Sequence, residues 1–313
     1  DLTLSDHIHL LRFDDNLFKK WDICQNLHLR LLKKNNLKLF SNSIKQLINN
    51  TTIDNSILSL ILTPPSYRTF QNNLSNYDPL DLYDMRNSYL IKFYKNLKDD
   101  LYNLFKNLIE KFYINSDLKI RSLIKILLEA LCTIDNNFAK NIAEEFCDSK
   151  IMEIKMIGLT SCIKYNHSNS INLLKKFYSE FQNDKIVLEK WFQIRSSYNN
   201  SYFDGINSIK DILKNKNFEY KNPNFVRAIF SSFQGINIEL FHAKDGSGYK
   251  FVTDQIIIID KINPQTAARI ITPMTNISKF NDITKNRIKR YLKKIINSNP
   301  SNDVFEVVSK VLG

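Results

Sequence analysis

The sequence predicts an all-α protein in which antiparallel helix pairs stack into a curved solenoid of the HEAT or armadillo type. Short segments with helical apolar periodicity follow one another along the chain, separated by short polar links. Two Asn-Pro helix starts, at Asn222 and Asn263, stand 41 residues apart. That spacing lies within the ~40–47 residue period of HEAT and armadillo repeats. No segment is typical of a β-strand, so we expect residues 1–313 to form a single α-solenoid domain.

The N-terminal part of the chain contains three helical segments and one long periodic run. Asp14 or Asp15 is the expected cap of the first segment, and Thr63-Pro64-Pro65 ends the third. The long run starts at Asp78-Pro79, and its apolar residues recur at helix-face intervals. The predicted segments are 15–32, 41–48, 55–62 and one continuous helix from 78 to about 113.

The C-terminal part consists of units of about three or four helical turns. Residues 251–259 are rich in β-branched side chains, but Asp254, Gln255 and the preceding turn favour a buried helix. Asp303 is the expected cap of the last helix, with Glu306 completing a capping box. The remaining predicted helices are 118–133, 137–147, 150–164, 170–181, 184–196, 205–214 and 282–296.

The stretch 222–269 combines two helix starts with a glycine loop. Each Asn-Pro pair supplies an N-cap and a proline at the first helical position, where no N–H is needed. In that register Arg227 and Arg269 fall in the second turn of their helices. The chain has only 6 glycines, and two of them, Gly246 and Gly248, occur together in this loop. We expect both to hold a backbone turn that other residues resist, so that Gly248→Val lowers stability.

Composition limits the classes of partner and compartment. The net charge of +12 comes from lysines scattered over the whole chain, alongside abundant asparagine and isoleucine. That pattern indicates compositional drift, so no nucleic-acid partner is predicted. The sequence has no apolar run of ~18 residues, so no membrane partner is predicted either. The four cysteines are far apart and include no Cys-x-x-Cys, which favours reduced thiols and a cytoplasmic setting. The chain begins with Asp1, and we expect it to be a fragment or a processed product.

No catalytic or metal-binding set is complete in the sequence. The five histidines include no H-E-x-x-H, and we expect His242 to be a helix-end residue bonded to backbone. The loop from Asp245 to Gly248 lacks the Gly-Lys-Ser/Thr ending of a phosphate cradle, so we interpret it as a rigid connector. No Gly-x-Ser-x-Gly elbow exists, and the pairs Phe177-Tyr178 and Trp191-Phe192 are interpreted as core.

Five segments, taken in order, resemble the C-terminal helical domain of bacterial-type aminopeptidase N, the zinc alanyl aminopeptidase family. The first resembles the family pattern F-N-R-W-E-A-x-Q, with departures at Lys19, Lys20, Asp22 and Ile23, and the second resembles L-V-M-D-K-W-F. The segments are FKKWDICQ at 18–25, KIVLEKWF at 185–192, NPNFVR at 222–227, FHAKDGSGY at 241–249 and NPQ at 263–265.

The resemblance implies that a zinc catalytic domain, with Gly-x-Met-Glu-Asn and H-E-x-x-H, lies upstream in the parent protein. The helical domain is then expected to cap that domain and to enclose a chamber that admits peptides. Its partners are the catalytic domain of the same polypeptide and peptide substrates. The chain alone is expected to bind no zinc and to be inactive. The alternative is a free-standing HEAT-like scaffold that binds protein or RNA, and an upstream H-E-x-x-H would discriminate between them.

Three side chains are candidates for substrate binding. The resemblance matches Gln265, Arg269 and Arg227 to positions whose side chains project toward the substrate cavity. Gln265 and Arg269 are four residues apart on one helix face, so both side chains can reach one cavity. The guanidinium of Arg269 has a planar donor fork suited to a carboxylate or carbonyl. The alternative role for Arg269 is an ordinary interhelix salt bridge.

Overall fold

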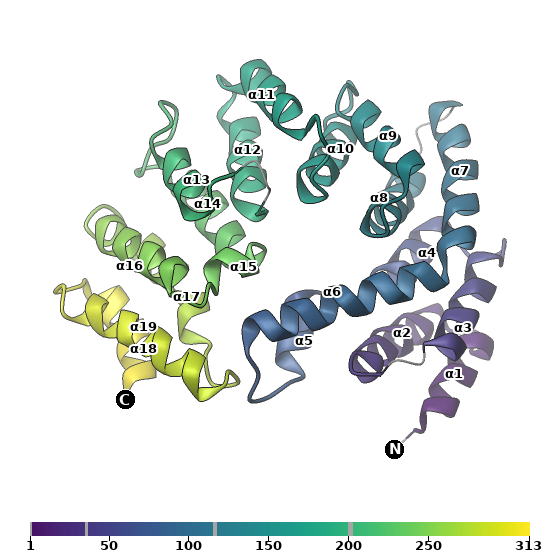
Figure 1. Cartoon of the computed structure of the whole chain (residues 1–313), viewed down its shortest axis with the longest axis horizontal. Coiled ribbons are helices and arrows are strands. Elements are labelled where there is room, and N and C mark those ends of the chain that lie inside the picture. Colours follow the sequence, from purple (N-terminus) through teal and green to yellow (C-terminus); the bar gives the residue numbers. More distant parts are fainter. Residues whose placement is uncertain (1, 35–36, 115–117, 200–202) are drawn as a thin grey trace. The chain divides into compact units, whose positions relative to one another are not determined.

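The chain is all-α in the computed structural model, which describes residues 2–34, 37–114, 118–199 and 203–313 (Figure 1). Those residues contain nineteen α-helices. The only β-type backbone pairing among the described segments is an isolated parallel bridge between Tyr77 and Phe280. The prediction of an all-α fold is therefore confirmed. No helix in the described ranges combines the length and the apolarity needed to cross a membrane.

The chain divides into two compact units, and each is described by itself. Unit 1 comprises Asp1–Asn73 and Asp84–Tyr165, whereas unit 2 comprises Leu74–Tyr83 and Asn166–Gly313. Helix α6 (Pro79–Asn96) contributes its first residues to unit 2 and the rest to unit 1. The expectation of a single domain over 1–313 stays a prediction.

Unit 1 is built from neighbouring helices that bury their apolar faces against one another. Helix α8 packs against both α4 and α7, and α9 packs against α10, while α1 contacts α2 and α3. The centre of these contacts contains Leu123, Leu127 and Phe105, all fully buried. Besides α6, the helices are α1 (Leu4–Phe13), α2 (Leu17–Leu31), α3 (Lys38–Ile48), α4 (Asn55–Leu62), α5 (Tyr67–Asn72), α7 (Lys98–Ile114), α8 (Leu118–Thr133), α9 (Asn137–Phe146) and α10 (Met152–Lys164).

The single long helix predicted over 78–113 is wrong, because α6 ends at Asn96 and α7 begins at Lys98. The break falls at Leu97, which is fully buried and whose carbonyl accepts the N–H of Leu101 at 2.9 Å. Asp99 and Asp100 follow in the first turn of α7, where carboxylates favour a helix N-terminus. The apolar periodicity runs on through the break because both helices bury a face.

Unit 2 is a two-layered stack. One layer consists of α12, α14, α17 and α19, each of which contacts the next, and α13, α16 and α18 lie in successive contact in the other. Helices of the first layer begin 38 to 41 residues apart, which matches the predicted repeat. The helices are α11 (Ser170–Phe181), α12 (Lys185–Ser197), α13 (Gly205–Leu213), α14 (Pro223–Gly235), α15 (Ile238–Phe241), α16 (Ser247–Asp260), α17 (Pro264–Thr275), α18 (Asp282–Ile296) and α19 (Asn302–Leu312).

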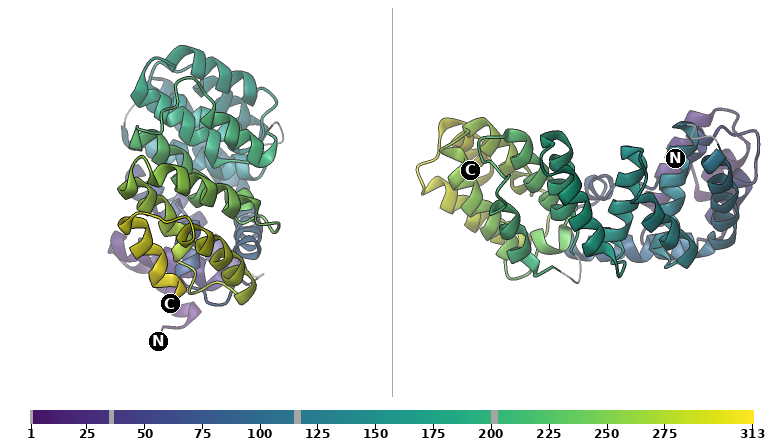
Figure 2. Two further views of the ribbon diagram at one scale, coloured as in Figure 1. Left: turned by 90° about the vertical axis from the view of Figure 1, so that its left-hand side faces the viewer. Right: turned by 90° about the horizontal axis from the view of Figure 1, so that it is seen from above.

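Short links connect the paired helices of unit 2. Three residues join α16 to α17 and five join α18 to α19, so consecutive helices turn back on each other as antiparallel hairpins (Figure 1 and Figure 2). The buried core between the layers contains Phe192, Phe225, Phe230, Phe233 and Tyr249. Burying each such aromatic side chain contributes about 1.5–3 kcal/mol. The prediction of stacked helix pairs is confirmed.

The two Asn-Pro helix starts follow the predicted capping chemistry. The side chains of Asn222 and Asn263 accept the backbone N–H groups of Asn224 and Thr266, each at 3.0 Å. Residues 251–259 lie within α16, as predicted.

Two of the predicted caps are wrong. The cap of α2 is Asn16, which follows Asp14 and Asp15 and accepts the N–H of Lys19 at 3.1 Å. The cap of α19 is Ser301, which accepts the N–H of Val304 at 3.4 Å, so Asp303 lies inside the helix. Asn, Ser and Asp side chains can all accept the free backbone N–H groups of the first helical turn. The sequence pattern therefore does not show which of the neighbouring residues is the cap.

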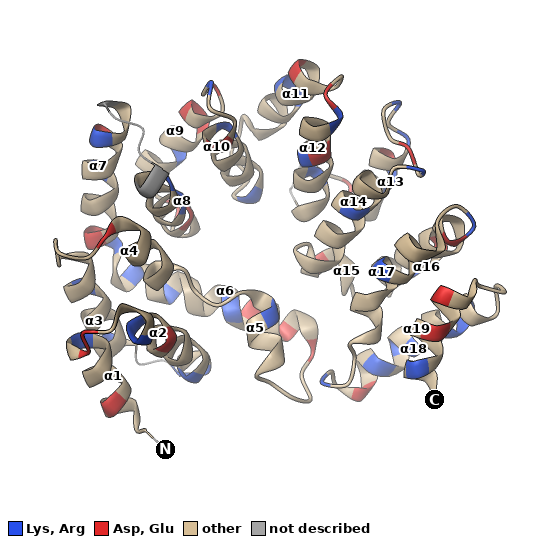
Figure 3. Ribbon diagram, turned by 180° about the vertical axis from the view of Figure 1, so that it is seen from behind, with Lys and Arg blue, Asp and Glu red and all other residues tan. Residues whose placement is uncertain are grey.

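Basic residues are distributed over many elements. Figure 3 shows Lys and Arg on helices throughout both units, with Asp and Glu between them. This distribution agrees with the scatter of basic residues along the sequence and does not by itself indicate a polyanionic binding partner.

Candidate functional site

The N-terminus of α14 presents Arg227 on its exposed side. Asn222 caps the helix and Pro223 occupies its first position, which places Arg227 in the second turn as predicted. Phe225 and Val226 beside it are buried, whereas the Arg227 side chain is exposed. Its guanidinium folds back on its own helix, where Nε donates to the Pro223 carbonyl at 3.2 Å and a terminal nitrogen donates to the Asn224 side chain.

The N-terminus of α17 presents Gln265 and Arg269 together. Both side chains are exposed, while Thr266, Ala267 and Ile270 face the core. The i,i+4 spacing thus places them on one face of the helix, as the sequence indicated. Within the described residues Arg269 makes no hydrogen bond or ion pair, so the alternative of an interhelix salt bridge has no partner there.

Helices α14 and α17 are held in register by a buried amide. The side chain of Gln234 donates from Nε2 to the carbonyl of Ile270 at 3.0 Å and to that of Phe230 at 3.2 Å. Gln234 is only 4 % exposed, so its side-chain N–H groups have little access to water and are satisfied by these two carbonyls. The contact fixes the neighbouring turn of α17, which carries Arg269.

Pro273 lies inside α17 and changes the backbone at Arg269. Proline has no N–H, so the carbonyl of Arg269 cannot receive the usual donor four residues on. Thr272, the residue before Pro273, donates its hydroxyl to the Ala268 carbonyl at 3.1 Å. The helical hydrogen bonding is therefore altered in the turn that carries Arg269.

Glycine is required at positions 246 and 248 for different reasons. Gly246 has φ +77° and forms the N-terminal cap of α16, so the predicted special backbone is present at this residue. Gly248 lies in the helix without positive φ, but a Cβ there would meet the carbonyl oxygens of Leu240 at 2.2 Å and Phe241 at 2.3 Å. The expected turn geometry is thus wrong for Gly248, which is needed because α15 and α16 approach closely.

His242, next to the loop, is a buried structural residue. It ends α15, but its ring Nδ1 lies 2.6 Å from the hydroxyl of Tyr249 and not against backbone, which corrects the predicted partner. Phe241 and Phe280 surround the ring edge-on. Burial lowers the pKa of His242 to about 3, so the imidazole is neutral near pH 7 and is not poised for proton transfer.

The described residues do not assemble a metal centre. No three side chains of His, Cys, Asp or Glu in these ranges gather within reach of one ion. All four cysteines are buried and free, and burial raises the pKa of Cys132 to about 12. Protonated thiols of this kind are poor zinc ligands, since the metal binds the thiolate.

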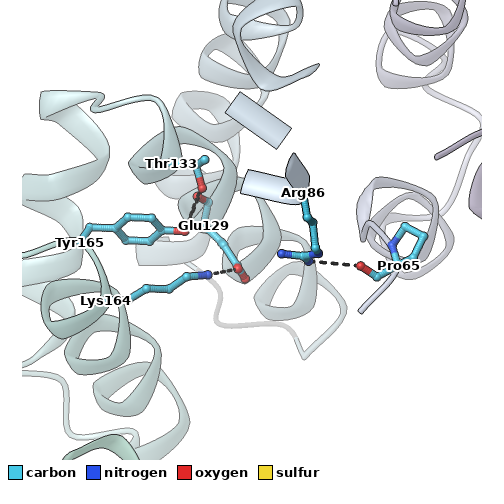
Figure 4. A network of polar contacts seen from close by, with 6 residues as sticks. All are labelled: Pro65, Arg86, Glu129, Thr133, Lys164 and Tyr165. Atoms are coloured by element: carbon cyan, nitrogen blue, oxygen red, sulfur yellow. Dashed lines mark hydrogen bonds and ion pairs between the residues drawn. The ribbon is translucent and has the colours of Figure 1, made fainter. Parts of the chain in front are cut away.

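A polar network in unit 1 resembles a site at first sight, but its groups are paired with one another (Figure 4). Lys164 donates to the carboxylate of Glu129, while the hydroxyls of Thr133 and Tyr165 donate to the Glu129 carbonyl at 2.8 and 3.1 Å. Burial is the largest influence and acts to raise the pKa of Glu129, but Lys164, Arg86 and Lys125 together outweigh it and the pKa is lowered. These contacts join the ends of α8 and α10.

Arg86 is tied to the same region of unit 1 by a separate contact. Its guanidinium donates to the Pro65 carbonyl at 3.1 Å (Figure 4). It also lies over the Phe70 ring, with 5.8 Å between the cation and the ring centre. No sequence pattern singled out this residue. We assign the network a structural role because its charged groups are committed to backbone and to each other.

One feature of unit 2 was missed in the sequence. The prediction that Phe177-Tyr178 and Trp191-Phe192 belong to the core is confirmed, since Phe177 and Phe192 are buried and Tyr178 and Trp191 pack against the core while partly exposed. Tyr178 and Trp191 also line a cavity of about 490 Å³, together with Arg195. The signal was available in the sequence, because Trp191 and Arg195 are four residues apart and share a helix face.

The comparisons with known proteins agree with this architecture. The family model DUF3458_C, a domain of unknown function described as ARM repeats, matches residues 4–313. The chain belongs to this family. Its fold is therefore an all-α solenoid of the armadillo type, and the predicted resemblance to the C-terminal domain of aminopeptidase N is confirmed by the relatives below.

Similarity to individual proteins extends over the whole chain. Aminopeptidase N of Haemophilus influenzae is 27% identical over 325 residues, covering 100% of this chain and 37% of that protein. Aminopeptidase N of Escherichia coli is 23% identical and covers 97% of this chain and 36% of that protein. The crystal structure of Legionella pneumophila aminopeptidase A in complex with aspartic acid matches with a TM-score of 0.88 and 25% identity.

The match is to part of each larger protein. The Legionella structure aligns with 100% of this chain, which in turn covers 39% of that chain. The chain thus spans just over a third of the length of the relatives it matches.

Proposed function

We propose that this chain is the C-terminal, chamber-forming domain of a zinc metalloaminopeptidase that removes N-terminal residues from peptides. The observation that carries the proposal is similarity over 100% of the chain to aminopeptidase N of Haemophilus influenzae, together with the matching fold of the Legionella aminopeptidase. In this arrangement the chain's partners are the catalytic domain of the same polypeptide and the peptide substrate. We place the enzyme in the cytoplasm, where free cysteines such as those of this chain stay reduced.

The zinc ion and the glutamate base belong to the catalytic domain in this proposal. The metal supplies a water of lowered pKa when it is bound. The helical chain contributes walls and positioning. Since the proposal places the catalytic groups in the other domain, the isolated chain is expected to release no amino acids from amide substrates.

Gln265, Arg269 and Arg227 are the side chains that we assign to substrate binding. The amide of Gln265 can both donate to and accept from a peptide backbone. Arg269 is exposed and its donors are uncommitted within the described part of the chain, so a peptide carbonyl or carboxylate can take them. The case for substrate binding by Arg227 is weaker, because its guanidinium already donates hydrogen bonds to its own helix.

The test uses the whole enzyme and compares two substrates. Arg269→Ala is expected to lower kcat/KM for a tripeptide by roughly ten- to hundredfold, the value of one charge-assisted hydrogen bond of ~1.5–3 kcal/mol. A small amino-acid amide, which lacks the distal part of the substrate, should be affected much less. Arg269→Lys should recover only part of the loss because the ammonium lacks the planar fork.

Two further observations bear on the proposal. Equal losses on both substrates with a lowered melting temperature would assign Arg269 to the structure and remove it from the binding site. The reading frame upstream of Asp1 is the second check, since the proposal requires H-E-x-x-H there. Its absence would favour a free-standing helical scaffold.

A further inference from the structure

Unit 2 contains a cavity of about 490 Å³ between α11 and α12, well separated in sequence from the helix starts of α14 and α17. Cavities of this size are typical of sites for small organic molecules. Two cations and several aromatic and aliphatic side chains line it, and none of the lining residues is acidic. Those that matter for recognition are Ile171, Lys175, Tyr178, Trp191, Arg195 and Phe203.

Arg195 is the chemically unusual member of this lining. Its guanidinium carbon lies 3.5 Å from the centre of the Phe203 ring, and its Nη1 nitrogen is buried. No hydrogen-bond acceptor for that nitrogen exists among the described residues. Buried donors are rarely left unpaired, and Arg195 lines the cavity, so its guanidinium is the group there that a ligand acceptor would bind.

The charge of Arg195 is retained but poorly solvated. Burial lowers its pKa to about 10, with Asp211 acting in the opposite direction, so the guanidinium is protonated at neutral pH. Asp211 is itself committed to Lys214, whose Nζ lies 2.9 Å from its carboxylate. Arg195 therefore provides a permanent cation that contacts no anion of the described chain.

The aromatic walls are already fixed in place. The indole N–H of Trp191 donates to the Leu174 carbonyl at 3.2 Å, and the Trp191 and Tyr178 rings lie 4.8 Å apart. The Tyr178 hydroxyl donates to the Asn215 side chain at 3.0 Å and accepts from Asn217 at 3.1 Å. Walls held by such bonds need no reordering when a ligand enters, which lowers the entropic cost of binding.

We propose that this cavity binds an organic monocarboxylate with an apolar body, the carboxylate on Arg195 and the apolar group between Tyr178, Trp191 and Ile171. The guanidinium fork matches a carboxylate, and the exposed Lys175 adds a second positive charge at the cavity. A phosphate group alone would leave the aromatic walls without a partner. The simplest ligand of this class is an N-blocked aromatic amino acid or the hydrophobic C-terminal residue of a peptide. The proposal is independent of the peptidase function.

The chain contains only two tryptophans, Trp21 and Trp191, so fluorescence can report on the cavity directly. The reporter is the 313-residue chain with Trp21→Phe, in which Trp191 is the sole indole. N-acetylphenylalanine is titrated against N-acetylphenylalaninamide, which has the same apolar body without the charge. We expect saturable binding of the acid that is at least about tenfold tighter than that of the amide.

A peptide ending in phenylalanine, tested with a free and an amidated C-terminus, separates the two sources of the ligand. Preference for the free peptide over N-acetylphenylalanine would assign the cavity to peptide C-termini, and the reverse would assign it to small carboxylates. Inorganic sulfate is the control anion that lacks an apolar group. At comparable concentration it should not compete with N-acetylphenylalanine. Equal binding of acid and amide, competition by sulfate, or no saturation up to about 20 mM would overturn the proposal.

Variants at Arg195 complete the test. Arg195→Met preserves much of the side-chain volume and should weaken binding of the acid about tenfold or more, leaving the amide unchanged. The matched control is Arg290→Met, because Arg290 also stacks on an aromatic ring, Tyr291, at 5.2 Å, but in α18. If Arg195→Met does not fold by circular dichroism, Arg195→Lys and the acid–amide comparison on the parent chain decide the question. Undiminished acid binding in a folded Arg195 variant would refute the role of this cation.

Discussion

Replacing Gly248 by alanine tests the packing at the centre of unit 2. The added Cβ would lie 2.2 Å from the Leu240 carbonyl oxygen, whereas ordinary contacts begin at 3.4 Å. The clash of about 1.2 Å is with backbone, which cannot rotate away as a side chain can. Helices α15 and α16 would have to separate, and Tyr249 beside Gly248 is fully buried in the core. Overpacking of this kind costs about 1–3 kcal/mol, and two carbonyls in contact favour the upper end.

Two other glycines provide matched comparisons. Gly246→Ala must hold φ +77°, which costs about 1–2 kcal/mol, but its Cβ would meet only the far end of the Tyr291 side chain at 2.8 Å. Gly235, the last residue of α14, has no neighbouring atom within 4 Å of the point where a Cβ would lie, and its φ is not positive. Gly235→Ala should therefore raise the stability by about 0.4–1 kcal/mol, through the loss of freedom in the unfolded chain.

The assay is thermal and urea unfolding of the three variants, followed by far-UV circular dichroism. For a chain of 313 residues, a loss of about 3 kcal/mol corresponds to a fall of about 5 °C in Tm. We expect Gly248→Ala to be the least stable, Gly246→Ala intermediate and Gly235→Ala above the parent chain. A Gly248→Ala variant as stable as the parent would show that α15 and α16 do not approach this closely, and the steric argument would fail.

The remaining predictions concern acid stability and capping. Burial lowers the pKa of His28 and of His242 to about 3, so the unfolded chain binds their protons first. Stability should thus be full above pH ~6.5 and fall by about 1.4 kcal/mol per histidine and pH unit on acidification toward pH ~3. His242→Gln should flatten this slope in urea titrations at several pH values; an unchanged slope would mean that other groups control it. Asn263→Ala should cost ~1 kcal/mol in the same assay, because the Thr266 N–H loses its acceptor. No measurable loss would show that water replaces the cap.

Local chemistry in the sequence was sufficient for most of the helices. The bounds of α4, α8, α11 and α18 were predicted without error, because periodicity and capping residues act within a few positions of each other. The same register correctly placed Gln265 and Arg269 on one exposed face. Helices α1, α5 and α15 were not predicted, since each is short and depends on contacts made elsewhere in the fold.

Tertiary structure alone decided where elements meet. The need for glycine at position 248 comes from carbonyls of another helix, and the partner of His242 is a tyrosine seven residues away. The cavity around Arg195 exists because side chains of α11, α12 and Phe203 leave a space between them. Hydrogen bonding along a helix is a property of neighbouring residues, so the sequence determines it. The filling of space between helices depends on atoms that come together only when the chain has folded.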